Sequence, residues 1–509
     1  MYRNRRAEPV RYHLAMVADP PTSSDTAAGP GRRRAPWWAV TTYFAEGFPY
    51  ALVRLLATPF FRDAGASLQA VGLTSLYGLP WNLKFLWAPA VDTTATKRRW
   101  IVTMEAVLAG IALAQAAIAG LADPLGAASV AFLVMAVAAA THDIAIDGYY
   151  LEALDRTEQA RWVGFQSMAY RIALIAGGGG LIYVSGRTSW TVAWVVAAGA
   201  LALLGVVHGL LLPRIETPRR PLRALLAGLA RPRFLVPFLG AAGAVLGVRF
   251  VLARPWAEGI RTLLGALTVP QWIVLGLLTV MVGVAVRAPA LKRRLYASDS
   301  TYALAFVDYL DQPRIGVILA FIALYRTGES FLLNMAYPFL KAIGVTRAQY
   351  GIAYGTFGIA AAIAGAMLGG ILIARYGLRR CIWPFVAAQN VLNLLYMALA
   401  LHERPALEGA AHPAVDIRLV TALIAVEAFG AGLGSSAFQV FIMRTTKASY
   451  KAAHMAIATA LMSVSATLAG VASGFLAAEL GFPVYFGLTF LATIPAMVLI
   501  PFVPQLRER

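Results

Sequence analysis

Cysteine is nearly absent from this chain, which has one, Cys381, in 509 residues. A single cysteine excludes a disulfide framework and any metal or iron–sulfur site that needs several thiolates. Charged residues are scarce too, at 14% of the chain, whereas soluble domains carry about a quarter. The sequence also lacks a GxxxxGK(S/T) run, which is the phosphate-binding loop expected of ATP-driven transport.

Apolar residues take the place of the missing charges, at 59% of the chain. This composition predicts an all-α integral membrane protein that lies in a lipid bilayer. The formal net charge of +19 would suggest a nucleic-acid partner in a soluble protein. Here the positive-inside rule explains it better, so we expect no nucleic-acid partner.

Windows of about 20 apolar residues divide the chain into 14 predicted membrane spans. The N-terminal bundle, 36–212, contains spans near 36–61, 68–91, 100–120, 126–150, 161–184 and 189–212. A linker, 213–313, contains two extra spans near 234–252 and 263–286. The C-terminal bundle, 314–503, contains spans near 315–340, 348–374, 381–401, 417–443, 454–479 and 482–503. Residues 1–35 and 504–509 are predicted to be tails, the first of them disordered, with either Met1 or Met16 as the start.

Basic residues gather in alternate loops, and most of them share one side if the N-terminus is inside. The clusters on that side are Lys97–Arg99, Arg219–Arg223, Lys292–Arg294, Arg379–Arg380 and Lys447–Lys451. Both termini are therefore predicted to be cytoplasmic.

Two halves of six spans suggest the internal repeat of secondary transporters. A basic turn follows the second span of each half, and the second copy reads GGILIARYGLRR. Through Gly370, Arg375, Gly377 and Arg379 it resembles the loop motif of the major facilitator superfamily, although Ala374 stands where that motif carries Asp. The pattern predicts a major facilitator fold with an inserted helix pair.

Ionisable residues inside the predicted spans are the main functional signal. A charge at bilayer depth costs several kcal/mol, so such residues face a cavity or a partner and mark substrate or proton pathways. Arg326 and Glu329 are three apart and share a helix face, and Asp143 and Asp147 are four apart on another. Two acids on one buried face repel, so one of them is expected to carry a proton.

Several span sequences, in order from about Trp37 to Pro504, resemble the AmpG-type muropeptide permeases. They are YFAEGFPYAL, LKFLWAPAVD, THDIAIDGYY, AYRIALIAGG, YRTGESF and VEAFGAGLGSSAF. The resemblance implies proton-coupled import of anhydromuropeptides through the bacterial inner membrane during cell-wall recycling. Acetyl-coenzyme-A and siderophore permeases look similar. The chain departs from the family at His142, where Gln is common, and at Arg326 and Glu329, where Lys and Asp are common.

The expected cargo is therefore a small anionic or glycopeptide molecule carried together with protons, and fixed cations and aromatic rings are its expected ligands. The predicted substrate-binding residues are Tyr43, Lys84, Tyr170, Arg171, Arg326 and Gln439. The predicted proton-coupling or gating residues are Glu46, Asp143, Asp147, Glu329 and Glu427.

Each of these residues also has a structural interpretation. Lys84 can neutralise Glu46 or Asp147, Arg326 can neutralise Glu329 or Glu427, and the span-four acids can serve in static packing. His142 is read as a hydrogen bonder between helices, because no second His lies at ligand spacing. Aromatic residues such as Trp81, Tyr325 and Phe438 can stack on sugar rings or only pack.

The sequence as a whole predicts a monomeric transporter and not an enzyme, since it shows no nucleophile–base pair, metal motif or cofactor motif. An importer of a siderophore or an acyl-coenzyme A, or a membrane sensor that binds such a ligand without moving it, is the alternative. A sensor would need a large signalling domain, which the sequence does not show.

The predicted topology is testable with reporter fusions. A reporter that is active only in the periplasm should be active at Gly409 and silent at Arg220. The opposite result would reverse the orientation of every span.

Overall fold

The structure is a computed structural model that describes residues 37–84, 87–154, 156–214, 301–410, 413–447 and 451–506, with isolated positions between 254 and 294. The described residues are helical throughout and contain no strand. Residues 38–509 form one compact unit, separate from 1–37. The predicted helix pair at 234–252 and 263–286 and the N-terminal tail lie outside the described residues, apart from isolated positions in the second span.

The N-terminal half follows the six predicted spans, with the first two divided into short helices. Its elements are α1 (Trp37–Arg54), α2 (Ala57–Asp63), α3 (Leu68–Leu73), η1 (Thr74–Gly78), α4 (Leu79–Leu83), α5 (Ala88–Thr93), α6 (Lys97–Ile118), α7 (Leu125–Ala153), α8 (Arg156–Leu174), η3 (Ile175–Gly180), α9 (Leu181–Arg187) and α10 (Trp190–Leu211).

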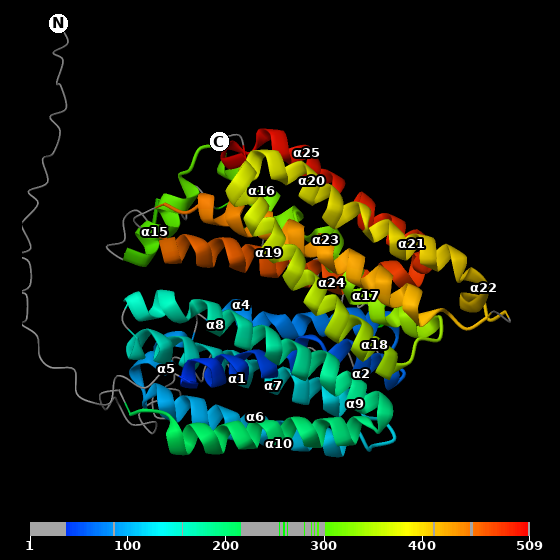
Figure 1. The fold of residues 1–509 in the computed structure, drawn as a ribbon, viewed down its shortest axis with the longest axis horizontal. Coiled ribbons are helices and arrows are strands. Elements are labelled where there is room, and N and C mark those ends of the chain that lie inside the picture. Colours follow the sequence, from blue (N-terminus) through cyan, green and yellow to red (C-terminus); the bar gives the residue numbers. More distant parts are fainter. Residues whose placement is uncertain are drawn as a thin grey trace, which may run out of the picture. The chain divides into compact units, whose positions relative to one another are not determined.

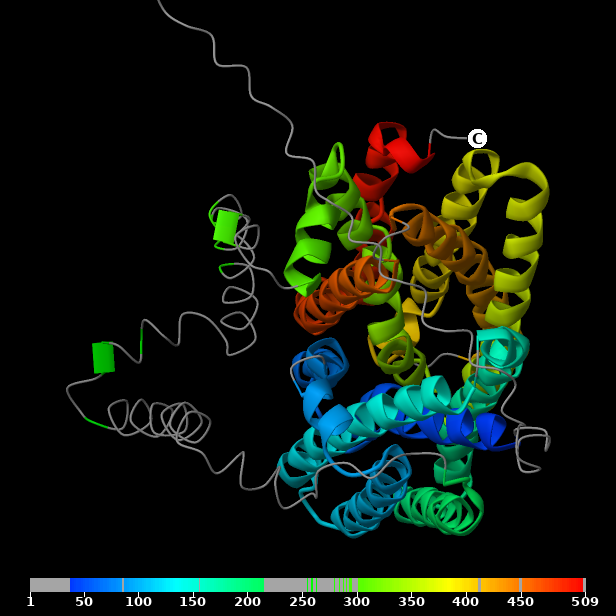
Figure 2. The same cartoon turned by 90° about the vertical axis from the view of Figure 1, so that its left-hand side faces the viewer.

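The C-terminal half repeats this plan. Its elements are α15 (Thr301–Leu310), α16 (Ile315–Leu324), α17 (Thr327–Ala342), α18 (Arg347–Ile352), η5 (Ala353–Gly358), α19 (Ile359–Tyr376), α20 (Leu378–Val391), α21 (Asn393–His402), α22 (Arg404–Leu407), α23 (Ile417–Arg444), α24 (Lys451–Leu491), α25 (Ile494–Leu499), η7 (Ile500–Phe502) and η8 (Pro504–Leu506). The elements of the two halves lie in two layers, one coloured from blue to blue-green and the other from bright green through yellow to red (Figure 1 and Figure 2).

Nine stretches of the described helices are long and apolar enough to cross a membrane. This number is smaller than the prediction for three reasons. The helix pair of the linker lies outside the described residues, α1 is not apolar enough while α2 to α5 are too short, and α24 runs through two predicted spans. The last two spans are separated at Gly481, whose φ of 70° breaks the helical path. The all-helical architecture is confirmed, whereas the count of 14 is not.

Glycines bring the two halves into contact near one end of the molecule. Gly179, in the π-helical turn η3, lies against Gly355 in the equivalent turn η5, so close that a side chain on either would meet the other backbone. Gly186 likewise lies against the backbone of Ala348. Small residues allow this approach, as they do at helix interfaces in membranes. The glycine run at 177–180 therefore serves in packing.

Candidate functional site

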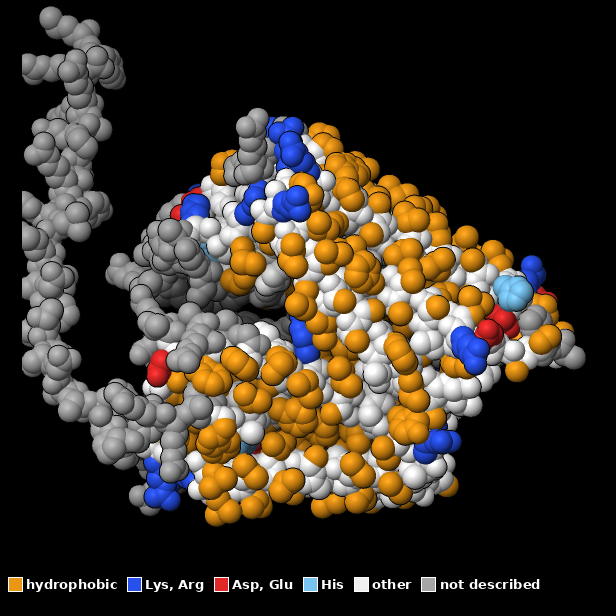
Figure 3. Space-filling model, in the orientation of Figure 1, with side chains coloured by type: hydrophobic (Ala, Val, Ile, Leu, Met, Phe, Trp, Pro, Cys, Tyr) orange, Lys and Arg blue, Asp and Glu red, His pale blue; other side chains and the backbone are white. Residues whose placement is uncertain are grey.

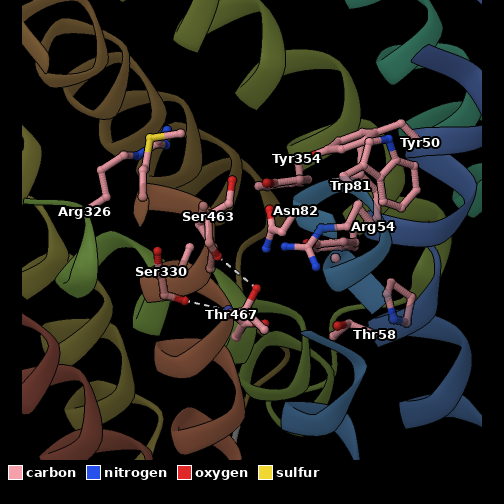
Figure 4. Close-up of a pocket in the computed structure, with 18 residues that line it drawn as sticks. Tyr50, Arg54, Thr58, Trp81, Asn82, Arg326, Ser330, Tyr354, Ser463 and Thr467 are labelled. Carbon is pink, nitrogen blue, oxygen red and sulfur yellow. Dashed lines mark hydrogen bonds between the residues drawn. The ribbon is translucent and has the colours of Figure 1, made fainter. Parts of the chain in front are cut away.

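A cavity of about 360 Å³ lies between the two halves. From the N-terminal half it is lined by Tyr50, Arg54, Leu55, Thr58, Pro59, Gly78, Trp81 and Asn82. From the C-terminal half it is lined by Arg326, Ser330, Leu333, Asn334, Tyr350, Tyr354, Met462, Ser463, Ala466 and Thr467. In Figure 4, Arg326 and Ser330 face Arg54, Trp81 and Asn82 across this space. The described lining contains two guanidinium groups and no carboxylate, which suits an anionic, polar ligand.

The aromatic wall of the cavity comes from both halves, with Tyr50 and Trp81 on one side and Tyr350 and Tyr354 on the other. The rings of Tyr50 and Trp81 meet edge to face with centroids 5.2 Å apart. By contrast, Tyr325 and Phe438 stack on each other at 4.5 Å and are buried, so they pack the C-terminal half and are not free to stack on a ligand. Trp81 is the one member of that predicted group that lines the cavity.

Arg326 and Glu329 form a bidentate ion pair at the edge of the cavity. The chain breaks helical geometry between α16 and α17, and this puts Arg326 at the start of α17 and Glu329 in its first turn. The Arg326 Nε donates to Glu329 Oε2 at 3.0 Å, and Nη2 donates to Oε1 at 2.5 Å. Gln389 adds a hydrogen bond to Glu329 Oε2 at 2.7 Å. Two of the five guanidinium hydrogens are thus engaged with Glu329, and three are left for the cavity.

A second polar group, in the N-terminal half, joins α1, α4 and α7. The Lys84 Nζ lies 2.5 Å from Asp143 Oδ2 and 3.9 Å from Asp147 Oδ2. The Tyr43 hydroxyl donates to Asp147 at 3.1 Å, and Glu46 brings a third carboxylate within 4.8 Å of the other two. Lys84 is therefore paired chiefly with Asp143 and more loosely with Asp147, which is one of the two partners that the structural interpretation names.

Three carboxylates at this spacing are also close enough to hold a metal ion. The Lys84 ammonium already supplies a cation to them, and the prediction that the chain binds no metal stays a prediction. Asp147 has a side chain 48% exposed, whereas the side chain of Asp143 is 9% exposed, so the group runs from the protein interior to an accessible surface.

The second cavity, of about 400 Å³, adjoins this acidic group. It is lined by Tyr43, Glu46, Gln166, Ser167, Tyr170, Arg171 and Leu174. Its Tyr170 ring lies 6.0 Å from the ring of Tyr50 in the first cavity. Tyr43, Glu46, Tyr50 and Arg54 recur every three or four residues, so a single face of α1 serves both cavities.

Two predicted site residues lie elsewhere. Glu427 is buried in α23, and its Oε1 has no hydrogen-bond partner among the described residues. Gln439, on the same helix, is exposed and lines neither cavity. The structure therefore brings the predicted residues of the N-terminal half together and pairs Arg326 with Glu329 separately, but it leaves Gln439 outside. The residues of the N-terminal group are Tyr43, Glu46, Lys84, Asp143, Asp147, Tyr170 and Arg171.

A cluster of ion pairs and hydrogen bonds surrounds Asp63, at the end of α2, and the sequence did not predict it. Its Oδ1 accepts from Lys341 Nζ at 2.5 Å and from the Tyr337 hydroxyl at 2.7 Å. Its Oδ2 lies 3.1 Å from Arg347 Nε and accepts from Trp190 Nε1 at 3.1 Å. These residues lie at span ends, where charges are ordinary, so only their convergence distinguishes them.

The Asp63 cluster joins the halves beside the Gly179–Gly355 contact. On the predicted topology this is the periplasmic end. At the opposite end the surface is hollowed between the two layers (Figure 3). The central cavity is thus closed at the Asp63 cluster.

Comparison with known proteins shows which transporters this chain resembles. The sequence profile of the Major Facilitator Superfamily matches residues 318–509. An uncharacterized protein of Haemophilus influenzae is 24% identical over 478 residues, which cover 92% of this chain and 94% of that protein. The anhydromuropeptide permease of Escherichia coli K12 is 22% identical over 466 residues, which cover 90% of this chain and 77% of the permease. A Rickettsia typhi transporter named AmpG 2 is 30% identical over 217 residues, or 42% of this chain and 50% of that protein.

Solved structures agree on the fold. A peptide transporter of the POT family in complex with sulfate has a TM-score of 0.62 at 14% identity and covers 92% of this chain and 94% of its own. A D-xylose–proton symporter has a TM-score of 0.57 at 13% identity, with 92% and 98% covered. The named relatives are transporters, which confirms the expectation of a transporter and not an enzyme. The chain is a multi-pass membrane transporter with the major facilitator fold, and its sequence is similar to that of the anhydromuropeptide permease and the AmpG transporters.

Proposed function

We propose that this protein imports an anhydromuropeptide from the periplasm to the cytoplasm together with protons. The observation that carries the proposal is the central cavity, which combines two arginines, two amides and an aromatic wall. A disaccharide-peptide offers sugar faces for aromatic rings, hydroxyls for amides and carboxylates for guanidinium groups. The relationship to an Escherichia coli protein named for this cargo supports the same assignment.

The two cavities suggest where each part of such a cargo binds. The sugar rings lie against Tyr50 and Trp81 in the central cavity, where Asn82 and Asn334 supply hydrogen-bonding groups. The peptide extends past the Tyr50–Tyr170 junction into the second cavity, where Arg171 supplies a cation. A bulky, elongated cargo fits two adjoining spaces better than either cavity alone.

Proton coupling rests on Lys84. While its ammonium lies against Asp143, that carboxylate has a compensating cation. If a carboxylate of the cargo attracts Lys84 away, the group of Glu46, Asp143 and Asp147 loses its nearest cation. One acid then takes up a proton, because uncompensated like charges repel at this spacing. Cargo and proton thus bind together.

Alternating access rests on the Asp63 cluster. The conformation described here is closed at the predicted periplasmic end and hollowed at the other, as is required for release to the cytoplasm. Opening toward the periplasm must break the contacts of Asp63 with Lys341 and Arg347, since those residues belong to the other half.

Uptake by purified protein tests cargo and coupling together. Proteoliposomes containing the full chain should accumulate a radiolabelled disaccharide-peptide when a proton gradient is imposed, and an uncoupler should abolish accumulation. Asp143→Asn should reduce accumulation at least tenfold while it changes equilibrium binding of the same compound only slightly, because an amide cannot carry a proton.

Two comparison compounds, a siderophore and an acyl-coenzyme A, identify the cargo in the same assay. Gradient-driven uptake of one of these in place of the disaccharide-peptide would reassign the cargo. Equal loss of binding and accumulation in folded Asp143→Asn protein would show that this residue serves in packing.

Arg326 should contribute directly to binding. Arg326→Ala should weaken binding by about 1.5–3 kcal/mol, which is typical of a lost charged hydrogen bond. Glu329→Gln should preserve binding, because Gln389 can still hydrogen-bond position 329, but should remove the dependence of uptake on the gradient. Binding isotherms and uptake rates measure the two effects. Arg404→Ala removes a similar but exposed ion pair with Glu408 and should change neither.

A double replacement separates function from mutual neutralisation. If Arg326 and Glu329 only satisfy each other, Arg326→Met combined with Glu329→Gln should restore uptake that either single change destroyed, since no buried charge remains unpaired. Restored gradient-driven uptake would contradict the functional assignment of both residues.

Asp63→Asn should shift the protein toward the state open to the periplasm. The change removes the charge that holds Lys341 and Arg347, at a cost of about 1.5–3 kcal/mol to the closed state. Spin labels at the exposed positions Ser67 and Thr346, with Cys381 replaced by Ser, should show an added population at longer distance. Asp123→Asn, an exposed aspartate on the same predicted side, is the control. An unchanged distance distribution would exclude Asp63 as the latch.

A further inference from the structure

Four helices of the N-terminal half meet at a buried polar cluster that contacts neither cavity. Glu105 on α6, His142 on α7 and His208 on α10 have fully buried side chains, and Thr41 on α1 completes the group. The sequence draws attention to His142 alone. Glu105 is 37 residues and His208 is 66 residues from it, and both lie on other helices, so no local spacing connects the three.

Glu105 and His208 share a hydrogen. The His208 Nδ1 lies 2.6 Å from Glu105 Oε1, which requires one hydrogen between the two atoms. The second nitrogen of His208 lies 3.0 Å from the Thr41 hydroxyl, whose own hydrogen has the Trp38 carbonyl as an acceptor at 3.2 Å. Both ring nitrogens of His208 therefore have partners.

His142 differs from His208 in this respect. Neither of its ring nitrogens has a hydrogen-bond partner among the described residues, although the side chain is completely buried. Its Nε2 lies 3.6 Å from the same Glu105 Oε1, just beyond hydrogen-bond range, and Glu105 Oε2 has no partner either. A buried imidazole thus points at a carboxylate that has capacity for a second donor.

We propose that Glu105, His142 and His208 form a proton-binding site separate from the acids that face the second cavity. When His142 closes the gap to Glu105, its Nε2 takes up a proton from a hydronium ion of the solvent, which leaves as water. One N–H bond forms and one O–H bond of hydronium breaks, and the new N–H donates a hydrogen bond to the carboxylate. The Glu105 carboxylate then lies between two imidazole donors.

The surroundings favour this assignment. The titratable groups that reach Glu105 are His208 from α10 and His142 from α7, while α1 contributes only the Thr41 hydroxyl. Asp143 follows His142 on α7 and is held by Lys84. Release of Lys84 would leave a carboxylate on α7 without its cation and free that helix to move. An extra positive charge at His142 would then have a nearby counter-charge.

Titration of the histidines tests the proposal without any cargo, so its outcome is independent of the proposed function. Purified full-length protein with 15N-labelled imidazole rings contains six histidines, few enough to assign by single replacements. The signal that disappears in His142→Gln belongs to His142. In the wild-type protein this signal should change from the neutral to the protonated form between pH 9 and pH 5. In Glu105→Gln the same signal should stay neutral over that range.

His402→Gln removes an exposed histidine and is the matched control, because it should delete a different signal and leave the others unchanged. Thermal unfolding of each variant checks that it is folded. If Glu105→Gln does not fold, the signal that His142→Gln removes still decides the outcome. A His142 signal that stays neutral from pH 9 to pH 5 in the wild-type protein would overturn the proposal.

Discussion

Pairing of buried charges is the constraint on which this structure depends. An ionised side chain that loses its partner in an apolar interior destabilises the protein by several kcal/mol, far more than its pairing ever contributes. Four of the described acids accordingly have donors at short distance: Asp143 has Lys84, Glu329 has Arg326 and Gln389, Glu105 has His208, and Asp63 has Lys341. Each pair is also a switch, since any movement that separates it must supply a replacement charge or a proton.

The pairs fall into two classes: those within one half of the protein and those between the halves. Lys84–Asp143 and Glu105–His208 lie within the N-terminal half, and Arg326–Glu329 lies within the C-terminal half. They survive when the halves move as rigid bodies. Asp63 differs because its partners Lys341 and Arg347 belong to the other half. The hydrogen bond from Ser75 to Asn334 also crosses between the halves, but it joins neutral groups and is cheaper to break. The ion pairs of Asp63 therefore contribute more than the Ser75–Asn334 hydrogen bond to the free-energy difference between the two conformations.

The spacing of residues in the sequence predicted those contacts whose two residues lie on the same helix. Residues three or four apart share a face, so the approach of Arg326 to Glu329 and the common face of Asp143 and Asp147 followed from the sequence. The breaks within the first two spans did not follow, because a hydropathy window does not see short turns between apolar helices. The Asp63 cluster and the Glu105–His208 pair could not be predicted either. They join positions 278 and 103 residues apart, and helix packing alone brings those positions together.

The shared face of α1 connects the remaining elements. Tyr43 touches the acid group, Glu46 belongs to it, and Tyr50 and Arg54 line the central cavity. Thr41, two residues before Tyr43 and on another face of α1, reaches His208 in the buried cluster. A bend or shift of α1, which contains Pro49 between these groups, would therefore alter the central cavity, the acids around Lys84 and the Glu105 cluster together. Because the groups lie on one helix, a change in cargo occupancy can reach both sets of titratable residues without crossing to the other half.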